Sequence, residues 1–460
     1  MPYASIIIPT HDRAETLPYS LRSALGQTVH DIEIVIVGDG CTAEVRAVAE
    51  GFANADSRVR FLDLPKAPMR GAENRHQAVL SAQSPRIFYN DDDDILLSHH
   101  VEVLGAALDD VDVVDTPPVS INLDGAISLG IHNSASAAVS AMLQQETHKG
   151  VFDTHLAHTK SAYQTGDGAW IKASDRRVVL HMLKHFGANP SIKWKTVQRA
   201  TALSFHGMCR AGMRGSDRAS ELRNWEKQIL DGPDFERRAR GEGSYVFHGA
   251  RLIHALIPEG AGAPPPFLSI LADQNFPETQ LTTAQRAPVE AIYTMRRGER
   301  PDRQAAQAAF DDLLEARLAP EFPTGSITDL FLRHFAREDI LDFLTACRLR
   351  PAVCLGRLHL DAHTLGSAAG DDMSEIRAAM EECLPGPRFF FGASVASALS
   401  HMGRTEAAWD WAEEILPEAP NSFTEYGYWM LREKLALALG HEEAVSASRQ
   451  RMRELSERMT

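Results

Sequence analysis

The chain has 460 residues, of which 44% are hydrophobic and 24% charged, a composition typical of a globular protein. Its net charge of −15 argues against a nucleic-acid-binding protein, which would present a basic face. The five cysteines form no Cys-x-x-Cys pair, as in a reduced cytoplasmic protein. No apolar stretch approaches the roughly 20 residues of a membrane span, so we expect a cytoplasmic protein that is at most peripheral at the inner face of a membrane.

The first 115 residues alternate between two sequence periods. Apolar runs rich in β-branched residues lie at Ala4–Ile8, Ile32–Val37, Val59–Leu62, Arg86–Tyr89 and Val111–Val114. Stretches with helical spacing lie between them, at Ala14–Leu25, Thr42–Ala53, Ala72–Ala82 and Ser98–Leu108. This alternation predicts a Rossmann-like, mostly parallel sheet with helices on both faces. Such sheets bind ligands at the carboxyl ends of their strands, so we expect the functional residues in the loops that follow the strands.

The remaining chain divides at a run rich in Gly, Ala and Pro, Gly260–Pro266, which indicates a linker. Before it, residues 116–165 indicate loops and an antiparallel edge, and a helical pattern covers Gly168–Phe186. After it, the pattern is almost entirely helical. We therefore expect an α/β domain with halves at 1–115 and 116–258, followed by an all-α domain at 267–460.

Within that helical part, two helices of small residues end at Gly403 and Gly440, and each is followed by a helix that begins with acidic residues. Glycine suits a helix end because it adopts positive φ without strain. Residues 390–455 thereby resemble tetratricopeptide repeats. Such hairpins either brace the first domain or bind a protein acceptor or partner subunit.

Polar turns follow three of the predicted strands. The first strand leads into Thr10-His11-Asp12-Arg13, and the second ends in Gly38-Asp39-Gly40. Asp39 can accept a hydrogen bond from a base or a ribose hydroxyl, although a turn aspartate also commonly satisfies its own backbone. The fourth strand leads into the Asp91–Asp94 run. We expect these turns to form one site, because the carboxyl ends of parallel strands share one edge of the sheet.

The Asp91–Asp94 run places four carboxylates side by side. Their repulsion is tolerable where a divalent cation neutralises it, and oxygen ligands select Mg²⁺ or Mn²⁺. A solvated acidic loop is the alternative. The position of the run, directly between a strand and a new helix, favours the metal site.

These motifs resemble those of the family-2 glycosyltransferases with the GT-A fold. Residues 5–13 match the family's strand followed by Pro-Thr-aromatic-Asn-Arg, and residues 21–28 match its Leu-x-Ser-x-Leu-x-Gln-Thr helix. Further matches are Gly38-Asp39-Gly40-Cys41 to Asp-Asp-Gly-Ser, Ala72-Glu73-Asn74 to Ala-Arg-Asn, and Asp91-Asp92-Asp93 to Asp-x-Asp. The departures are Gly38 for the first aspartate, Glu73 for the arginine, and His11 and Asp12 for the aromatic residue and asparagine.

The resemblance implies a metal-dependent, inverting transfer of a sugar from a UDP- or GDP-type donor to a hydroxyl of a glycan or protein acceptor, as in polysaccharide biosynthesis. It implies donor-binding roles for Pro9, Thr10, Asp12, Arg13, Asp39, Arg70, Asn74, Asp91 and Asp92. It implies Mn²⁺ or Mg²⁺ ligands at Asp93, Asp91 and His206, and a catalytic base at Asp167. Without the resemblance, Asp167 is equally explained as a helix N-cap and His206 as a partly buried histidine. Arg210 and Arg214 either close over the phosphates or remain solvated charges.

Two other functions are compatible with parts of the sequence. Nucleotidyl transfer to a sugar phosphate also uses an α/β nucleotide site with Mg²⁺, but such enzymes carry a Gly-rich loop where this chain has Pro9-Thr10. A non-catalytic scaffold with a degenerate transferase domain would explain Gly38 and Glu73. Retention of the whole Asp91–Asp94 run argues against the scaffold.

Overall fold

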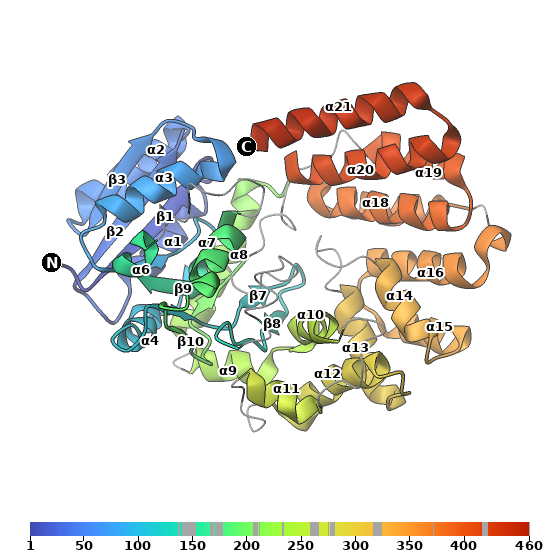
Figure 1. Ribbon diagram of the computed structural model, residues 1–460, viewed down its shortest axis with the longest axis horizontal. Coiled ribbons are helices and arrows are strands. Elements are labelled where there is room, and N and C mark those ends of the chain that lie inside the picture. Colours follow the sequence, from blue (N-terminus) through green and yellow to red (C-terminus); the bar gives the residue numbers. More distant parts are fainter. Residues whose placement is uncertain are drawn as a thin grey trace.

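A seven-stranded sheet organises the first half of the chain, with strand order β10-β6-β9-β4-β1-β2-β3 (Figure 1). Its strands are β1 (Ala4–Thr10), β2 (Ile32–Asp39), β3 (Val59–Leu64), β4 (Arg86–Tyr89), β6 (Val113–Asp115), β9 (Leu156–Thr159) and β10 (Trp194–Thr196). All pairs are parallel except those of β9, which runs antiparallel to both β4 and β6. The predicted mostly parallel sheet is thereby confirmed. The antiparallel strand lies inside the sheet, however, and not at the edge where the sequence placed it.

The computed structural model describes residues 1–136, 139, 153–165, 170, 178–205, 210, 212–231, 234–257, 266–274, 276, 281–315, 324–370, 372–415 and 422–459. Two short antiparallel pairs accompany the main sheet: β5 (Ile95–Leu96) with β11 (Ala202–Leu203), and β7 (Val119–Ile121) with β8 (Ile127–Leu129). In this described part of the chain, none of the helices is both long enough and apolar enough to span a membrane.

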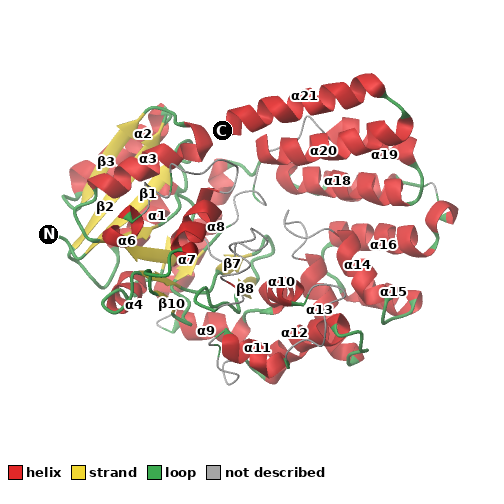
Figure 2. Ribbon diagram, in the orientation of Figure 1, coloured by secondary structure: helices red, strands yellow, loops and turns green. Residues whose placement is uncertain are grey.

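Helices cover both faces of the sheet (Figure 2). They are α1 (Leu17–Leu25), α2 (Ala43–Ala55), α3 (Pro68–Ser81), α4 (His100–Ala107), α6 (Lys160–Gln164) and α7 (Val178–Ala188). Side chains alternate between the faces of a strand, so Ile6 and Ile8 pack in one cluster with Leu21 of α1. Ile7 points the other way and packs in a second cluster with Val79 of α3. Burial on both faces explains why the strand sequences are continuously apolar.

The sequence predicts an almost entirely helical chain only from residue 267, and residues 215–256, which it places in the α/β domain, are mostly helical as well. The second half of the described chain is therefore helical. Its helices are α8 (Gly215–Asp231), α9 (Phe235–Glu242), α10 (Val246–Leu256), α11 (Phe267–Asp273), α12 (Thr283–Arg296), α13 (Arg303–Glu315), α14 (Thr324–Leu332), α15 (Arg337–Ala346), α16 (Arg350–Thr364), α17 (Ser374–Glu381), α18 (Pro385–His401), α19 (Thr405–Ile415), α20 (Ser422–Leu439) and α21 (Glu442–Met459). Gly403 and Gly440 follow α18 and α20 with φ of 78° and 73°, the left-handed conformation expected of glycine at a helix end. The tetratricopeptide-like arrangement itself stays a prediction.

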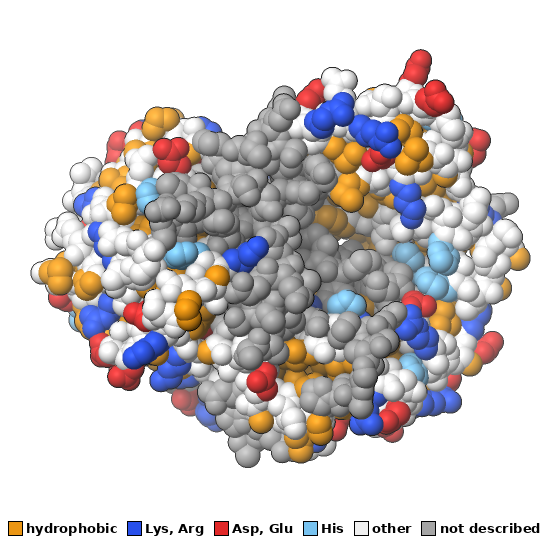
Figure 3. All heavy atoms as spheres, in the orientation of Figure 1, with side chains coloured by type: hydrophobic (Ala, Val, Ile, Leu, Met, Phe, Trp, Pro, Cys, Tyr) orange, Lys and Arg blue, Asp and Glu red, His pale blue; other side chains and the backbone are white. Residues whose placement is uncertain are grey.

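The first helices of the second half share one apolar core with the sheet. One buried apolar cluster extends from Ile7 of β1 as far as Leu360 of α16. A separate cluster begins with Leu355 of the same helix and continues to Leu435 of α20. The helices lead away from the sheet and return to it, so that α21 contacts α3 (Figure 1). Lys and Arg side chains gather over α21 on the face shown in Figure 3.

Candidate functional site

Three polar turns meet at the carboxyl edge of the parallel strands. Thr10, the last residue of β1, pairs with Gly38 of β2, and Ile7 of β1 pairs with Tyr89, the last residue of β4. The backbone N–H of Asn90 then donates to the Ile7 carbonyl at 3.0 Å. The ends of β1, β2 and β4 are therefore neighbours, which is the juxtaposition that the sequence predicts.

Asp39, at the end of β2, is 7% exposed, and its carboxylate is hydrogen-bonded by the loop after β3 and by α3. Its Oδ1 accepts from the Ala67 N–H and from Asn74 Nδ2, both at 2.8 Å, and its Oδ2 accepts from Lys66 Nζ at 2.8 Å. At Gly71, with φ of 77°, an added Cβ would lie 3.0 Å from this carboxylate. The first turn of α3 therefore needs glycine to approach so closely.

The structure thus brings together Asp39 and Asn74, which the sequence places in one site. Asn74 Nδ2 also donates to the Pro65 carbonyl at 2.9 Å, so it secures the loop that carries Lys66. Lys66 itself was missed by the sequence analysis. Its signal was its position after the third strand, which ends at the same edge of the sheet. Arg70 falls in the first turn of α3, and its side chain lies outside the described part of the structure.

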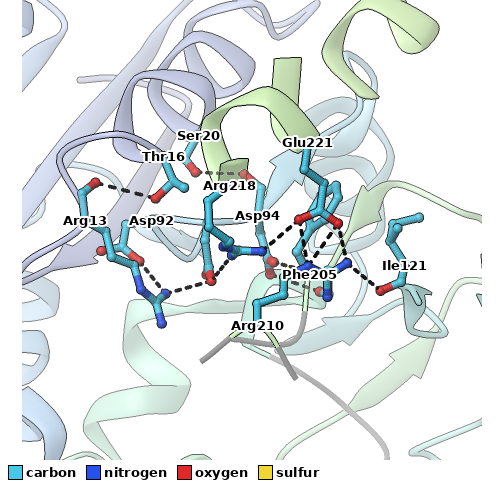
Figure 4. Close-up of polar contacts among 12 residues, drawn as sticks. Arg13, Thr16, Ser20, Asp92, Asp94, Ile121, Phe205, Arg210, Arg218 and Glu221 are labelled. Atoms are coloured by element: carbon cyan, nitrogen blue, oxygen red, sulfur yellow. Dashed lines mark hydrogen bonds and ion pairs between the residues drawn. The ribbon is translucent and has the colours of Figure 1, made fainter. Parts of the chain in front are cut away.

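The acidic turn after β4 is neutralised by two arginines (Figure 4). Arg13 Nη1 lies 2.9 Å from Asp92 Oδ1 and 2.8 Å from Asp93 Oδ2. Arg218 Nη2, from α8, lies 2.7 Å from the same Oδ2 of Asp93. The repulsion among the four carboxylates is thus relieved by protein cations, a role that the sequence analysis did not assign to Arg218.

Burial and the neighbouring charges shift the pKa values of this cluster in opposite directions. Burial raises the pKa of the Asp92 carboxyl, and the Arg13 guanidinium opposes that rise. The neighbouring Asp93 carboxylate raises the pKa of Arg13 above its usual value. The side chain of Arg13 is 43% exposed, whereas those of Asp92, Asp93 and Arg218 are 9% exposed or less. Arg13 is therefore the solvent-facing member of the cluster.

Asp94 faces away from this open side and secures the turn. Its Oδ2 accepts from Thr154 Oγ1 at 2.7 Å and from Ser204 Oγ at 2.9 Å, and its Oδ1 accepts from the Phe205 N–H at 2.8 Å. Burial raises the pKa of this carboxyl to about 7. The Asp91 N–H donates to Thr154 Oγ1 at 3.2 Å. The turn is therefore tied to the segment before β9 and to β11.

A line of alternating charges continues from the acidic turn along α8 (Figure 4). Arg218 Nη1 lies 3.1 Å from Glu221 Oε2, and Arg210 Nε donates to the same oxygen at 2.8 Å. Arg210 also donates to the Ile121 carbonyl at 3.1 Å, and its side chain is only 1% exposed. Arg214, by contrast, is 81% exposed and pairs with Asp217. Arg210 therefore holds Glu221 in place, and neither arginine contacts the acidic turn.

Some polar atoms at this edge have no protein partner among the described residues. They are His11 Nδ1 and Asn90 Oδ1, both buried. Buried polar atoms are nearly always hydrogen-bonded, so these two atoms favour a ligand at the ends of β1 and β4. Pro9 is half-buried in β1 and Asp12 is exposed just beyond it. The edge thus combines a buried, hydrogen-bonded carboxylate at Asp39 with exposed polar groups near Asp92.

Asp167 and His206 lie outside the described residues, as does Asp175, the next carboxylate along the chain after Asp167. Residues close to Asp167 and His206 in the sequence are hydrogen-bonded to residues of the site. Trp170 is 1% exposed, and its Nε1 donates to Tyr89 Oη at 3.1 Å. The Phe205 N–H, one residue before His206, donates to Asp94.

The oxygen ligands of the turn match the chemistry of a hard divalent cation. Both ion pairs of Asp93 use Oδ2, and no hydrogen bond from the described residues reaches its Oδ1. Over the same residues, no group of three or more His, Cys, Asp and Glu side chains is arranged to hold a metal ion. The arrangement fits a cation held by one or two carboxylates and otherwise by substrate phosphates and water, and it does not fit a cage made by protein alone.

The fold is an α/β fold with a mostly parallel sheet, and such sheets bind ligands at the edge where these polar turns meet. Residues 5–174 match the model of the family described as Glycosyl transferase family 2. The cholesterol galactosyltransferase of Borreliella burgdorferi is 32% identical over 112 residues, which cover 24% of this chain and 31% of that protein. The GalNAc(5)-diNAcBac-PP-undecaprenol beta-1,3-glucosyltransferase of Campylobacter jejuni is 26% identical over 104 residues, 23% of this chain and 34% of that one.

The chain therefore spans about a third of the length of the curated relatives it matches. Among solved structures, S. aureus TarS 1–349 in complex with UDP-GlcNAc is similar to this chain with a TM-score of 0.36 and 12% identity, covering 85% of this chain and 91% of that one. The family match, the relatives and the sheet topology support a GT-A glycosyltransferase.

Proposed function

We propose that this protein transfers a sugar from a nucleotide diphosphate donor to a hydroxyl of a glycan or protein acceptor, with inversion at the anomeric carbon. The observation that carries the proposal is that Asp39 and the acidic turn lie at the same edge of the sheet, inside the segment that matches the transferase family. A nucleoside pocket beside a diphosphate site is what such a donor requires.

Asp39 marks the proposed nucleoside site. A carboxylate offers about four acceptor positions, and the protein fills three of those of Asp39 through Lys66, Ala67 and Asn74. One position is left for an N–H of the base or a ribose hydroxyl. Those three contacts orient the carboxylate before the donor arrives.

The diphosphate is proposed to lie between β1 and the acidic turn. The proposed contacts on the β1 side are Pro9, Thr10, Asp12 and Arg13. Those on the side of the acidic turn are Asp91 and Asp92, and Arg70 is added from α3. Arg13 is the exposed cation of the cluster, and a guanidinium forms paired hydrogen bonds with phosphate oxygens. Arg13 therefore serves to bind and orient the diphosphate.

Mn²⁺ or Mg²⁺ is the proposed cofactor, held by Asp93 and Asp91 with His206 as a further ligand. When bound, such an ion supplies positive charge to the departing nucleotide diphosphate. The chain's own contribution is to hold the two carboxylates in place, which the hydrogen bonds of Asp94 and Asp91 to Thr154 support.

Asp167 is the proposed catalytic base. A carboxylate close to the acceptor hydroxyl accepts its proton as the new bond forms. Asp167 lies three residues before Trp170, and Trp170 is hydrogen-bonded to the last residue of β4. That anchor supports a place for Asp167 near the acidic turn.

Donor binding tests the proposal directly. The melting temperature of the protein is measured with UDP, GDP and their sugar derivatives, with and without Mn²⁺, because a bound ligand stabilises the folded state by mass action. We expect one nucleotide to raise it, and Asp39→Ala to remove that shift. Asp63→Ala is the matched control, because Asp63 is an exposed carboxylate one strand away whose ion pair in the described part of the structure is with Arg46. No shift with any nucleotide, or an undiminished shift in Asp39→Ala, would contradict the proposal.

A further inference from the structure

Asp93 is the proposed metal ligand, yet the structure shows it already paired with two protein cations. Arg13 and Arg218 both reach its Oδ2, at 2.8 and 2.7 Å. They differ in how they are held, because Arg13 is 43% exposed whereas Arg218 is 9% exposed. Arg218 is thus a buried cation built into the site.

The position of Arg218 is fixed by α8. Arg22 of α1 donates from Nε and Nη2 to Glu226 of α8 at 2.7 and 2.9 Å. At the start of α8, a Cβ added to Gly215 would lie 2.4 Å from Glu15 Cδ, so that the helix end packs directly on the segment after Arg13. The helix therefore delivers the Arg218 side chain to the acidic turn from a rigid support.

Arg218 also has a second counter-charge. Its Nη1 lies 3.1 Å from Glu221 Oε2, and Glu221 is held in turn by the buried Arg210. If Asp93 turns to another cation, Arg218 keeps an ion pair and is not left as an unpaired buried charge, which would be costly. The arrangement therefore has two states that are both electrostatically satisfied.

We propose that Arg218 is the resident counter-ion of Asp93 in the donor-free protein, and that a divalent cation binds at Asp93 in competition with it. The inference rests on the proposed function, because it concerns the metal site of the donor. The Arg218 guanidinium contacts the Oδ2 of Asp93 and repels a doubly charged ion placed beside it. The arginine therefore lowers metal affinity in the donor-free site.

The test is Mn²⁺ binding to the nucleotide-free protein, measured by titration calorimetry and by the loss of the free Mn²⁺ electron paramagnetic resonance signal. We expect Arg218→Gln to tighten Mn²⁺ binding at least about tenfold, the low end of the effect of one neighbouring charge. Lys227→Gln is the matched control, because it removes one positive charge from the exposed side of the same helix. Its Mn²⁺ affinity should equal that of the wild type. Adding Asp93→Asn to Arg218→Gln should remove the gain.

Arg13→Gln provides a second route, because it removes the exposed cation from the same oxygen and leaves the buried contacts of α8 intact. It should also tighten Mn²⁺ binding. The proposal is overturned if neither arginine variant binds Mn²⁺ more tightly than the wild type, if Lys227→Gln shows the same gain, or if no variant binds Mn²⁺. Nucleotide binding separates the two proposals. If a nucleotide raises the melting temperature but Arg218→Gln does not bind Mn²⁺ more tightly, only the competition is overturned. If Arg218→Gln binds Mn²⁺ more tightly but no nucleotide raises the melting temperature, only the proposed function is overturned.

Discussion

At the scale of single residues, the proposed base offers a sharp test. Asp167→Asn preserves the shape of the side chain and removes its ability to accept a proton. We expect turnover to fall at least about a hundredfold, the usual contribution of a general base, while donor affinity stays unchanged. The measurements are the rate of nucleotide release with acceptor present and the dissociation constant of the nucleotide. If donor affinity collapses and turnover persists, Asp167 is a binding residue, and Asp175 becomes the next base to test.

Whether a site residue could be predicted depends on how far it lies in the sequence from its partner. Asp39, Asn74 and the acidic turn were predictable, because each belongs to a short motif next to a strand or helix end. Arg218 was not assigned, since its partner Asp93 lies 125 residues earlier and no local pattern records that pairing. Lys66 was missed for a similar reason, because its contact with Asp39 depends on the path of the loop after β3. The sequence left two interpretations of Arg210 open, and in the structure Arg210 pairs with Glu221.

At the scale of elements, β9 carries a buried histidine that contacts β4 and couples stability to pH. His158 is fully buried, and its Nε2 lies 2.8 Å from Tyr89 Oη. Burial lowers its pKa from 6.5 to about 4. Between pH 6.5 and about pH 4, His158 is therefore protonated in the unfolded chain and neutral in the folded chain. The free energy of unfolding falls as the pH drops through this range. We expect His158 to account for about 2 kcal/mol of the loss between pH 7 and pH 5.

Urea unfolding at these two pH values measures the effect. The variant His158→Gln retains a hydrogen-bonding side chain and does not titrate, so its stability should depend less on pH than that of the wild type by about that amount. His100, whose pKa burial lowers to about 3, remains in both proteins and supplies a common background. Equal pH dependence of wild type and variant would show that His158 does not titrate in this way.

The elements themselves followed from period and composition. β1, β2, β3 and β4 lie where continuous apolar runs predict strands buried on both faces, and α1 and α2 lie where the helical spacing predicts them. The antiparallel β9 was harder to place, because Leu156–Thr159 is a short segment whose pairing with β4 and β6 is made across the sheet and not with its neighbours in the chain. The mostly helical character of the second half was predictable, whereas its path back to α3 was not, because that path depends on helix packing.

At the scale of the whole molecule, the core decides where the chain can be divided. The apolar cluster that begins in the sheet continues through Phe310 of α13 and Phe331 of α14 to α16. A cut at the linker near Gly260 would therefore expose part of the core that supports the sheet. The separate cluster that begins with Leu355 of α16 extends through the described residues to Leu435 of α20. A cut after α16 leaves the first cluster whole.

This division allows the role of the C-terminal helices to be tested with a fragment of residues 1–370. Because the first cluster and the Asp39 and Asp93 contacts remain, we expect the fragment to fold, to bind nucleotide and to hydrolyse the donor at about the wild-type rate. If the helices α17–α21 bind the acceptor or a partner, transfer to the acceptor should fall steeply while donor hydrolysis persists. Leu355 and Leu358, which the cut exposes on α16, are replaced by lysine to keep the fragment soluble. Transfer to the acceptor at the full rate would show that these helices do not bind it. Loss of the folded state in the substituted fragment would instead show that the contact of α21 with α3 braces the transferase domain.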